Sequence, residues 1–222
     1  MNERWNKLNT GLLADRKITQ LLAITIGTLL VFSILSPNIF FSPNNFKSMS
    51  YQVPEIAILS IAVMLSMLTG GIDLSIVSIS NAAALVAAYV MRSKSDTTGT
   101  ESLMWILIAC VLGIIVGLIA GGINSILIAK LDVTPILATL ATMTLFNGIA
   151  IGMTDGVSVS GLPEQFMRVG NGTFFGIPTP FVLMVIIAGA VGLWINKTTL
   201  GLKIFLVGTN RKAAQYLSLI HI

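Results

Sequence analysis

Long apolar stretches separated by short polar connections dominate the chain. A helical span needs roughly 20 apolar residues to cross about 30 Å of hydrocarbon. Six stretches approach or exceed that length, at residues 18–36, 54–69, 74–91, 103–128, 135–153 and 178–196. Each is predicted to be an α-helix, because an isolated segment in lipid must satisfy its own backbone hydrogen bonds. The pattern therefore predicts an all-α fold, a polytopic membrane helix bundle with about six spanning helices.

A polar interruption separates the second span from the third. It reads Thr69-Gly-Gly-Ile-Asp-Leu-Ser75, with two glycines and a carboxylate between strongly apolar segments. One interpretation is a tight turn, in which Gly70 and Gly71 avoid side-chain clashes and Asp73 caps the third span, where a helix N-terminus favours negative charge. The other is a re-entrant break beside a solute path, since non-helical backbone at membrane depth needs protein or water around it.

Further polar side chains lie within the apolar segments, where they are costly and therefore candidates for function. Each asparagine either hydrogen-bonds a neighbouring helix or lines a solute path. Each threonine either bonds a carbonyl three or four residues back or faces that path. The candidate path residues, those of the interruption included, are Gly70, Gly71, Asp73, Ser75, Asn81, Asn124, Thr139, Thr142 and Asn147.

Small residues spaced four apart predict close helix packing in the membrane. Gly113, Gly117 and Gly121 form one such row in the fourth span. The row can serve packing within one subunit or a contact between two subunits.

Composition supports a membrane protein, since 55% of the 222 residues are hydrophobic and 10% are charged, against about 25% charged in soluble domains. The net charge of +4 does not indicate nucleic-acid binding, because the basic residues are sparse and lie beside apolar segments. With the N-terminus in the cytoplasm, nine of the 13 Lys and Arg residues fall on the inner side, which fits the positive-inside rule. The nine are Arg4, Lys7, Arg16, Lys17, Lys130, Lys197, Lys203, Arg211 and Lys212.

No catalytic constellation is present. The sequence contains no GxxxxGK[ST] loop for ATP, no HExxH and no CxxC motif, and its single histidine is His221. We therefore expect no metal site, no cofactor and no enzymatic activity in this chain.

The basic, amphipathic segment after residue 196 forms the last predicted part. Gly208 ends an apolar run, and Thr209 or Asn210 can cap a following short helix to Tyr216. Such a helix can lie on anionic lipid or dock a soluble partner. The predicted organisation is a cytoplasmic segment 1–17, a transmembrane domain 18–196 and a cytoplasmic segment 197–222.

Three motifs in order resemble the permeases of bacterial ABC importers for ribose, xylose, other simple sugars and autoinducer-2. Residues 68–75 are similar to that family's TGGIDLS signature. Residues 134–143, followed by Gly148, resemble its PPFIATLGTM…RG stretch. Residues 199–204 and 207–214 resemble its cytoplasmic T.GR.IYAVGGN..AA segment.

The resemblance implies a permease that carries a pentose, hexose or autoinducer-2-like solute across the bacterial inner membrane. It implies a second permease subunit, identical or paralogous, a cytoplasmic ABC ATPase and an extracytoplasmic sugar-binding protein, with membrane lipid around the spans. It favours partner docking for the C-terminal segment. The implied ATPase-coupling residues are Gly208, Asn210, Arg211, Lys212, Ala213 and Ala214.

Two departures from the family pattern stand out. Ile76-Val-Ser78 lacks the glycine that follows TGGIDLS in the family, and residues 217–222 do not continue its pattern. We therefore expect a truncated or frameshifted piece of a longer permease. The alternative function is a self-contained secondary transporter or channel with a broken-helix site.

Overall fold

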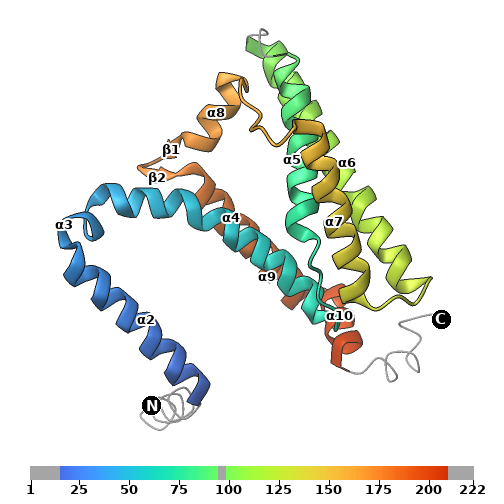
Figure 1. The fold of residues 1–222 in the computed structure, drawn as a ribbon, viewed down its shortest axis with the longest axis horizontal. Helices are drawn as coiled ribbons and strands as arrows, with labels where there is room; N and C mark the ends of the chain where they lie inside the picture. The colour runs from blue at the N-terminus through green and yellow to red at the C-terminus, as the bar shows by residue number, and fades with distance from the viewer. Residues whose placement is uncertain (1–15, 95–98, 210–222) are drawn as a thin grey trace. The chain divides into compact units, whose positions relative to one another are not determined.

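The computed structural model of the protein describes residues 16–94 and 99–209, and these are almost entirely helical (Figure 1). The elements are α2 (Arg16–Leu35), α3 (Pro37–Phe40), α4 (Pro43–Leu68), α5 (Ile76–Arg92), α6 (Gly99–Ala129), α7 (Pro135–Thr154), α8 (Glu164–Asn171), β1 (Thr173–Phe174), β2 (Ile177–Pro178), α9 (Thr179–Lys197) and α10 (Thr199–Thr209). Every predicted span is a helix, which confirms the all-α membrane bundle. Within the described residues, α2, α4, α6, α7 and α9 are long and apolar enough to cross a membrane, and α5 has 17 residues.

The chain divides into two compact units, residues 1–49 and 50–222. In the first unit α2 is followed by the short helix α3, where the Phe32 and Phe40 rings stack with centroids 6.4 Å apart. The hydroxyls of Thr25 and Thr28 donate to carbonyls four residues back, at 2.9 and 2.8 Å. These bonds satisfy the hydroxyls inside an otherwise apolar helix.

α4 begins eleven residues before the predicted span. Ser42 precedes Pro43, and the Asn45 N–H donates to the Ser42 hydroxyl at 3.2 Å. A serine cap with proline at the first helical position is a strong start signal. Pro54, predicted to open the span, lies buried inside the helix instead.

The core of the second unit lies among α5, α6 and α7, which pack against one another. Ala82 of α5, Ala120 of α6 and Phe146 of α7 form its buried apolar cluster. Gly113 allows α5 and α6 to approach, because a Cβ there would lie 3.2 Å from the Ala83 carbonyl oxygen. Gly117 and Gly121 have no described neighbour at this distance, so only Gly113 of the predicted row packs within the described chain.

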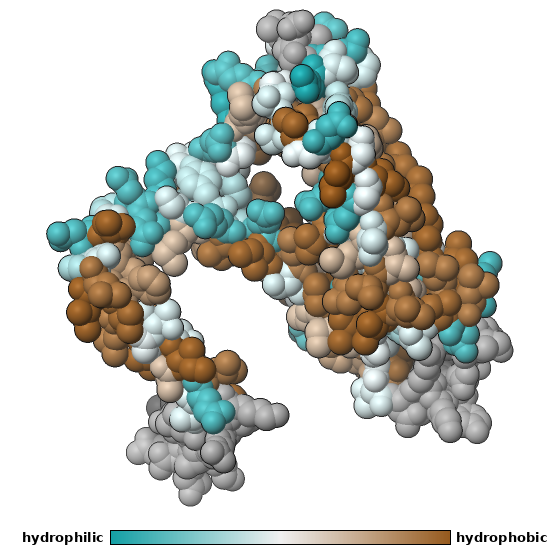
Figure 2. Space-filling view, in the orientation of Figure 1, coloured by the Kyte–Doolittle hydropathy of each residue, from teal (hydrophilic) through white to brown (hydrophobic). Residues whose placement is uncertain are grey.

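Large apolar side chains point outward from these helices. Leu107 and Leu118 of α6 are 66% and 70% exposed, and Figure 2 shows hydrophobic side chains over much of the visible surface of α6 and α7. Such a surface is unfavourable in water and suits contact with lipid tails.

Contacts between helix termini define two ends of the second unit. At one end the Tyr89 hydroxyl donates to the Met153 carbonyl, joining the last turns of α5 and α7. At the other end the Leu74 N–H donates to Thr139 Oγ1 at 3.2 Å, joining the start of α5 to the first turns of α7. The interruption at residues 69–75 thus lies level with helix termini, which favours the turn over the re-entrant break.

Candidate functional site

The interruption begins where α4 ends in a tightened turn. The N–H groups of Thr69 and Gly70 donate to the carbonyls of Ser66 and Met67, three residues back, at 3.1 and 3.0 Å. Gly70 then adopts φ +85°, the left-handed conformation that glycine accepts without strain. The Ser66 hydroxyl donates to the Gly71 carbonyl at 3.3 Å. The first glycine is therefore required by the reversal of the chain.

Asp73 organises the start of α5. Its Oδ1 accepts hydrogen bonds from the Ser75 N–H at 2.8 Å and from the Ser75 hydroxyl at 2.6 Å. Because α5 begins at Ile76, three residues after Asp73, Asp73 acts through an Asx-turn ahead of the helix. Asp73 therefore does not cap α5 directly as predicted: the helix starts two residues later than expected, Ser75 is its N-cap, and Asp73 holds Ser75 in place.

Ser75 extends this network to α6. The Asn124 amide Nδ2 donates to Ser75 Oγ at 2.7 Å, while Asn124 Oδ1 has no hydrogen-bond partner among the described residues. Ser75 is fully buried and Asn124 is 4% exposed. The resulting chain Asn124–Ser75–Asp73 ties α6 to the interruption. Asn124 therefore makes a hydrogen bond to the start of a neighbouring helix, which was one of its two predicted functions.

α7 holds the interruption from a second side. Thr139 Oγ1 accepts from Leu74 and lies 2.8 Å from the Pro135 carbonyl of its own helix, to which it can donate. A Cβ on Gly71 would lie 3.2 Å from Pro135 Cβ, so the second glycine allows the chain to pass the first turn of α7. Thr142 is buried and donates within α7, to Ala138 or Thr139.

The last turn of α10 touches the same place. The position of a Cβ on Gly208 lies 1.9 Å from the Leu68 carbonyl oxygen, well inside any tolerable contact. α10 continues to Thr209, so Gly208 lies inside a helix and does not end it. The residues that the family resemblance implies for ATPase coupling, Asn210, Arg211, Lys212, Ala213 and Ala214, and the predicted helix to Tyr216 lie outside the described residues.

A cavity of about 320 Å³ opens at the interruption. It is lined by Ser66, Thr69, Gly70, Gly71, Ile72, Asp73, Ile128, Pro135, Thr139 and Val207. Four candidate path residues, Gly70, Gly71, Asp73 and Thr139, therefore meet here. Ser75 and Asn124 stand behind this lining.

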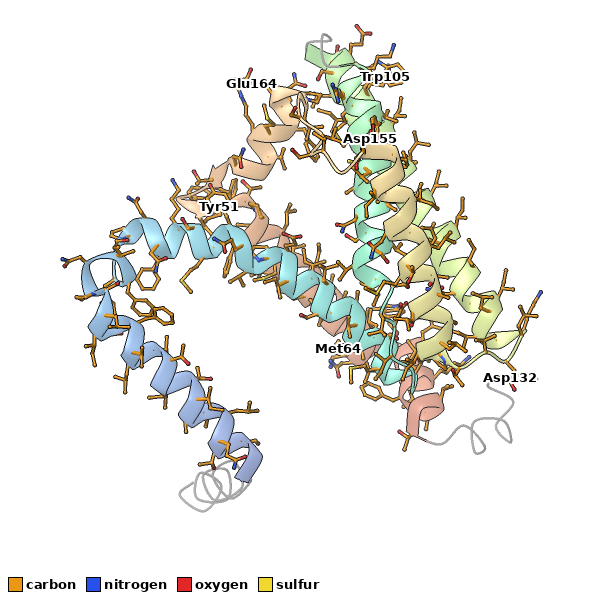
Figure 3. The ribbon with its side chains drawn as sticks, in the orientation of Figure 1. Tyr51, Met64, Trp105, Asp132, Asp155 and Glu164 are labelled. Carbon is orange, nitrogen blue, oxygen red and sulfur yellow. The ribbon has the colours of Figure 1, made fainter. Side chains whose placement is uncertain are left out.

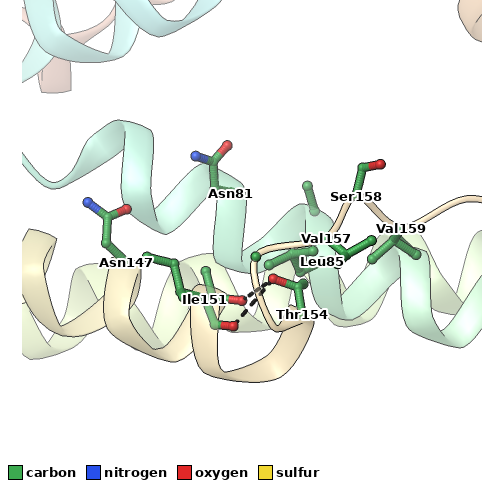
Figure 4. Close-up of a pocket in the computed structure, with 12 residues that line it drawn as sticks. Asn81, Leu85, Asn147, Ile151, Thr154, Val157, Ser158 and Val159 are labelled. Atoms are coloured by element: carbon green, nitrogen blue, oxygen red, sulfur yellow. Dashed lines mark hydrogen bonds between the residues drawn. The ribbon is translucent and has the colours of Figure 1, made fainter.

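Asn81 and Asn147 line a second cavity of about 550 Å³, which runs along α5 and α7 and reaches the connection after α7 (Figure 4). The figure shows the two amides projecting to the same side from the two helices. Neither amide hydrogen-bonds another side chain or backbone group in the described part of the chain. The other lining residues are Ala84, Leu85, Ala88, Ala150, Ile151, Thr154, Gly156, Val157, Ser158 and Val159.

Four candidate residues thus line the first cavity, and Asn81 and Asn147 line the second, while Ser75, Asn124 and Thr142 line neither. Sequence reasoning missed Pro135 and Val207 at the first cavity and Ser158 at the second. Pro135 stands inside a stretch that the motif comparison covered, whereas Ser158 lies in a connection that carries no periodic signal.

Comparison with known proteins places these features in context. Residues 45–219 match the family described as branched-chain amino acid transport system / permease component. Ribose import permease protein RbsC of Bacillus subtilis is 34% identical over 188 residues, which cover 83% of this chain and 55% of the relative. L-arabinose transport system permease protein AraH of Escherichia coli is 32% identical over 195 residues, 85% of this chain and 57% of the relative.

A third relative, autoinducer 2 import system permease protein LsrD of Klebsiella pneumoniae, is 28% identical over 211 residues, 90% of this chain and 59% of the relative. The chain therefore spans somewhat more than half the length of the curated relatives it matches. No solved structure matches it significantly.

Proposed function

Because the chain belongs to the permease-component family that matches residues 45–219, we propose that it is the membrane subunit of an ABC importer for a simple sugar. Relatives named for ribose, L-arabinose and autoinducer 2 support a pentose, hexose or autoinducer-2-like solute. In this proposal a second permease subunit, identical or paralogous, completes the solute path in the bacterial inner membrane. A separate ATPase supplies the energy, and an extracytoplasmic binding protein delivers the sugar.

The amides of Asn81 and Asn147 carry the proposal for the solute path. Each offers donors and an acceptor that no described residue uses, and a sugar hydroxyl needs both kinds of partner. Asn81 is exposed and Asn147 is half-buried, and an amide that faces lipid without a partner is costly, so a hydrophilic path beside them is favourable. The cavity volume of about 550 Å³ falls in the range of small-molecule sites, about 300–1,000 Å³.

The interruption is proposed as the inner boundary of the same path. Gly70, Gly71 and Asp73 would border it, while Ser75, Asn124, Thr139 and Thr142 would hold the backbone in place from within the bundle. This assignment puts two segments in the cytoplasm: residues 1–17, which precede the membrane domain 18–196 in the sequence, and residues 197–222, which follow it. The distribution of Lys and Arg supports that orientation.

α10 is proposed to connect the ATPase to the interruption. Its last turn contacts Leu68 through Gly208 and leads directly into the coupling residues Asn210, Arg211, Lys212, Ala213 and Ala214. Movement of this segment on ATP hydrolysis would then shift the end of α4 and the lining of the first cavity. Alternating access needs such a rigid link between the energy source and the gate.

Replacing Asn81 or Asn147 by alanine is expected to lower ATP-dependent uptake by about three- to tenfold, since a lost neutral hydrogen bond costs about 0.5–1.5 kcal/mol. The double variant should lose about the product of the two factors, provided that the amides bind separate hydroxyls. Uptake of labelled pentoses, hexoses and autoinducer-2 into vesicles with the assembled complex measures both effects.

Asn196→Ala provides the matched control for these two variants. Asn196 is an exposed α9 residue whose amide, among the residues that the structure describes, bonds only the Gly192 carbonyl, at 2.8 Å, so uptake should be unchanged. Unchanged uptake in Asn81→Ala and Asn147→Ala would refute the path assignment. Uptake that persists without the ATPase would favour a self-contained transporter.

Changing both Arg211 and Lys212 to glutamate is expected to weaken association with the ATPase, because four units of charge change at the proposed docking segment. Co-purification of the tagged permease with the ATPase measures the loss, with Lys47→Glu and Arg92→Glu together as the charge-matched control. Equal recovery of the ATPase with both double variants would contradict docking through residues 210–214.

A further inference from the structure

The hairpin between α8 and α9 carries an unusual turn. Thr173 pairs with Pro178 and Phe174 with Ile177, so Phe175 and Gly176 alone form the connection. Their φ angles are +51° and +82°, as in the type I′ turns that favour Asn-Gly. A bulky residue with positive φ is an outlier. The first turn position is therefore occupied by a residue that the backbone geometry disfavours.

The side chain at this position is also the most exposed of the large apolar side chains described. Phe175 is 92% exposed and Phe174 is 60% exposed, and Ile177 beside them is 48% exposed. The two phenylalanine rings contact edge to face, with centroids 4.7 Å apart. Neither the backbone nor packing within the described chain accounts for an aromatic residue at the turn.

The base of the hairpin, by contrast, is held firmly. The Tyr51 hydroxyl of α4 lies 2.8 Å from the Asn171 carbonyl, to which it donates (Figure 3). The Thr179 N–H donates to the Gly172 carbonyl at 3.0 Å. Gly172 leaves no room for a side chain, since a Cβ would lie 2.2 Å from the Arg168 carbonyl oxygen. The aromatic tip thus projects from a fixed support.

The hairpin lies beside the starts of two candidate membrane spans. Pro178 leads directly into α9, a candidate span, and the apolar part of α4 begins three residues after Tyr51, which contacts the hairpin base. Two spans therefore enter the hydrocarbon beside the hairpin. This is the interfacial layer, where segments that lie at the membrane surface bury Trp, Phe and Leu side chains at the boundary of the acyl chains.

We propose that the tip formed by Phe174 and Phe175 inserts into the lipid at the membrane surface and anchors the connection between α7 and α9. Burial of the two rings among acyl chains offsets the disfavoured φ of Phe175. The inference concerns the lipid bilayer alone and stands whether or not the sugar proposal holds.

Tryptophan fluorescence can test the insertion directly. Trp5, Trp105 and Trp194 are replaced by phenylalanine, Phe175→Trp is introduced as the only tryptophan, and the full chain alone is reconstituted in phosphatidylcholine vesicles with brominated acyl chains. The fluorescence of Trp at position 175 should be quenched at least roughly twofold more than that of Ser160→Trp. Ser160 is an exposed residue in the connection that precedes α8. Equal quenching at the two positions would overturn the proposal.

A second reporter separates insertion from local unfolding. Phe174→Trp should be quenched by the same lipids, and adding Phe175→Asn should reduce that quenching, although asparagine suits the turn and preserves the hairpin. Quenching that is unaffected by Phe175→Asn would contradict a joint aromatic anchor. If the fluorescence of the reporter did not change with brominated lipid and changed only when the extracytoplasmic binding protein was added, the tip would be a protein-docking surface. That result would refute the lipid proposal.

Discussion

Replacing Gly208 by alanine is expected to disrupt the contact between α10 and the end of α4 and to reduce ATP-driven uptake more than tenfold. The added methyl group would stand 1.9 Å from the Leu68 carbonyl oxygen, and neither backbone can yield without moving a whole helix. Overpacking of this kind costs about 1–3 kcal/mol and sometimes more. We expect about 3 kcal/mol here, measured as a lower thermal unfolding midpoint of the purified complex, together with the loss of ATP-driven uptake.

The control for this experiment is a Gly→Ala substitution that should stabilise its helix, whereas Gly208→Ala should destabilise the protein. Alanine stabilises a helix over glycine by roughly 0.5–1 kcal/mol where space allows. Gly192 in α9 has no neighbour within 4 Å of its Cβ position among the described residues, so Gly192→Ala should raise the midpoint slightly. If Gly208→Ala shifted the midpoint in the same direction as Gly192→Ala, the contact between α10 and α4 would be wrong.

The spanning helices could be predicted from the sequence because a long apolar stretch is what a membrane crossing requires. Their termini required other signals. Ser42-Pro43 carries the start of α4, yet the polar residues up to Val53 hide it from a hydropathy scan. α5 starts at Ile76 because Asp73 and Ser75 are used to hold its first turn. The hairpin escaped prediction because Phe175 stands where asparagine or glycine would have signalled the turn.

The site was predictable only in part, for a related reason. Gly70, Gly71 and Asp73 indicate a turn in the sequence, because these residue types favour turn conformations. Nothing near Gly208 indicates that its partner is a carbonyl 140 residues earlier, since tertiary packing decides that contact. The sequence also could not tell that Asn124 hydrogen-bonds Ser75 whereas Asn81 and Asn147 line a cavity. All three are asparagines within apolar segments, so only tertiary packing distinguishes them.

The two functions considered for Asp73 can be separated by a pair of substitutions. Asp73→Ala removes the acceptor of two hydrogen bonds from Ser75, at 2.8 and 2.6 Å. Bonds to a charged group are worth about 1.5–3 kcal/mol each, so we expect a loss of about 3 kcal/mol and poor assembly. Asp73→Asn keeps an oxygen at the same place and should assemble normally. Unfolding midpoints and the yield of assembled complex measure this difference.

Uptake then reports on the charge alone. Asp73 lines the first cavity, so its carboxylate can hold sugar hydroxyls more strongly than an amide can. We therefore expect Asp73→Asn to lower uptake about tenfold, an effect of about 1.4 kcal/mol, while the free energy of unfolding stays within about 1 kcal/mol of the parent. Normal uptake in an assembled Asp73→Asn complex would leave Asp73 a capping residue only, because the hydrogen bonds to Ser75 survive in that variant and the charge does not.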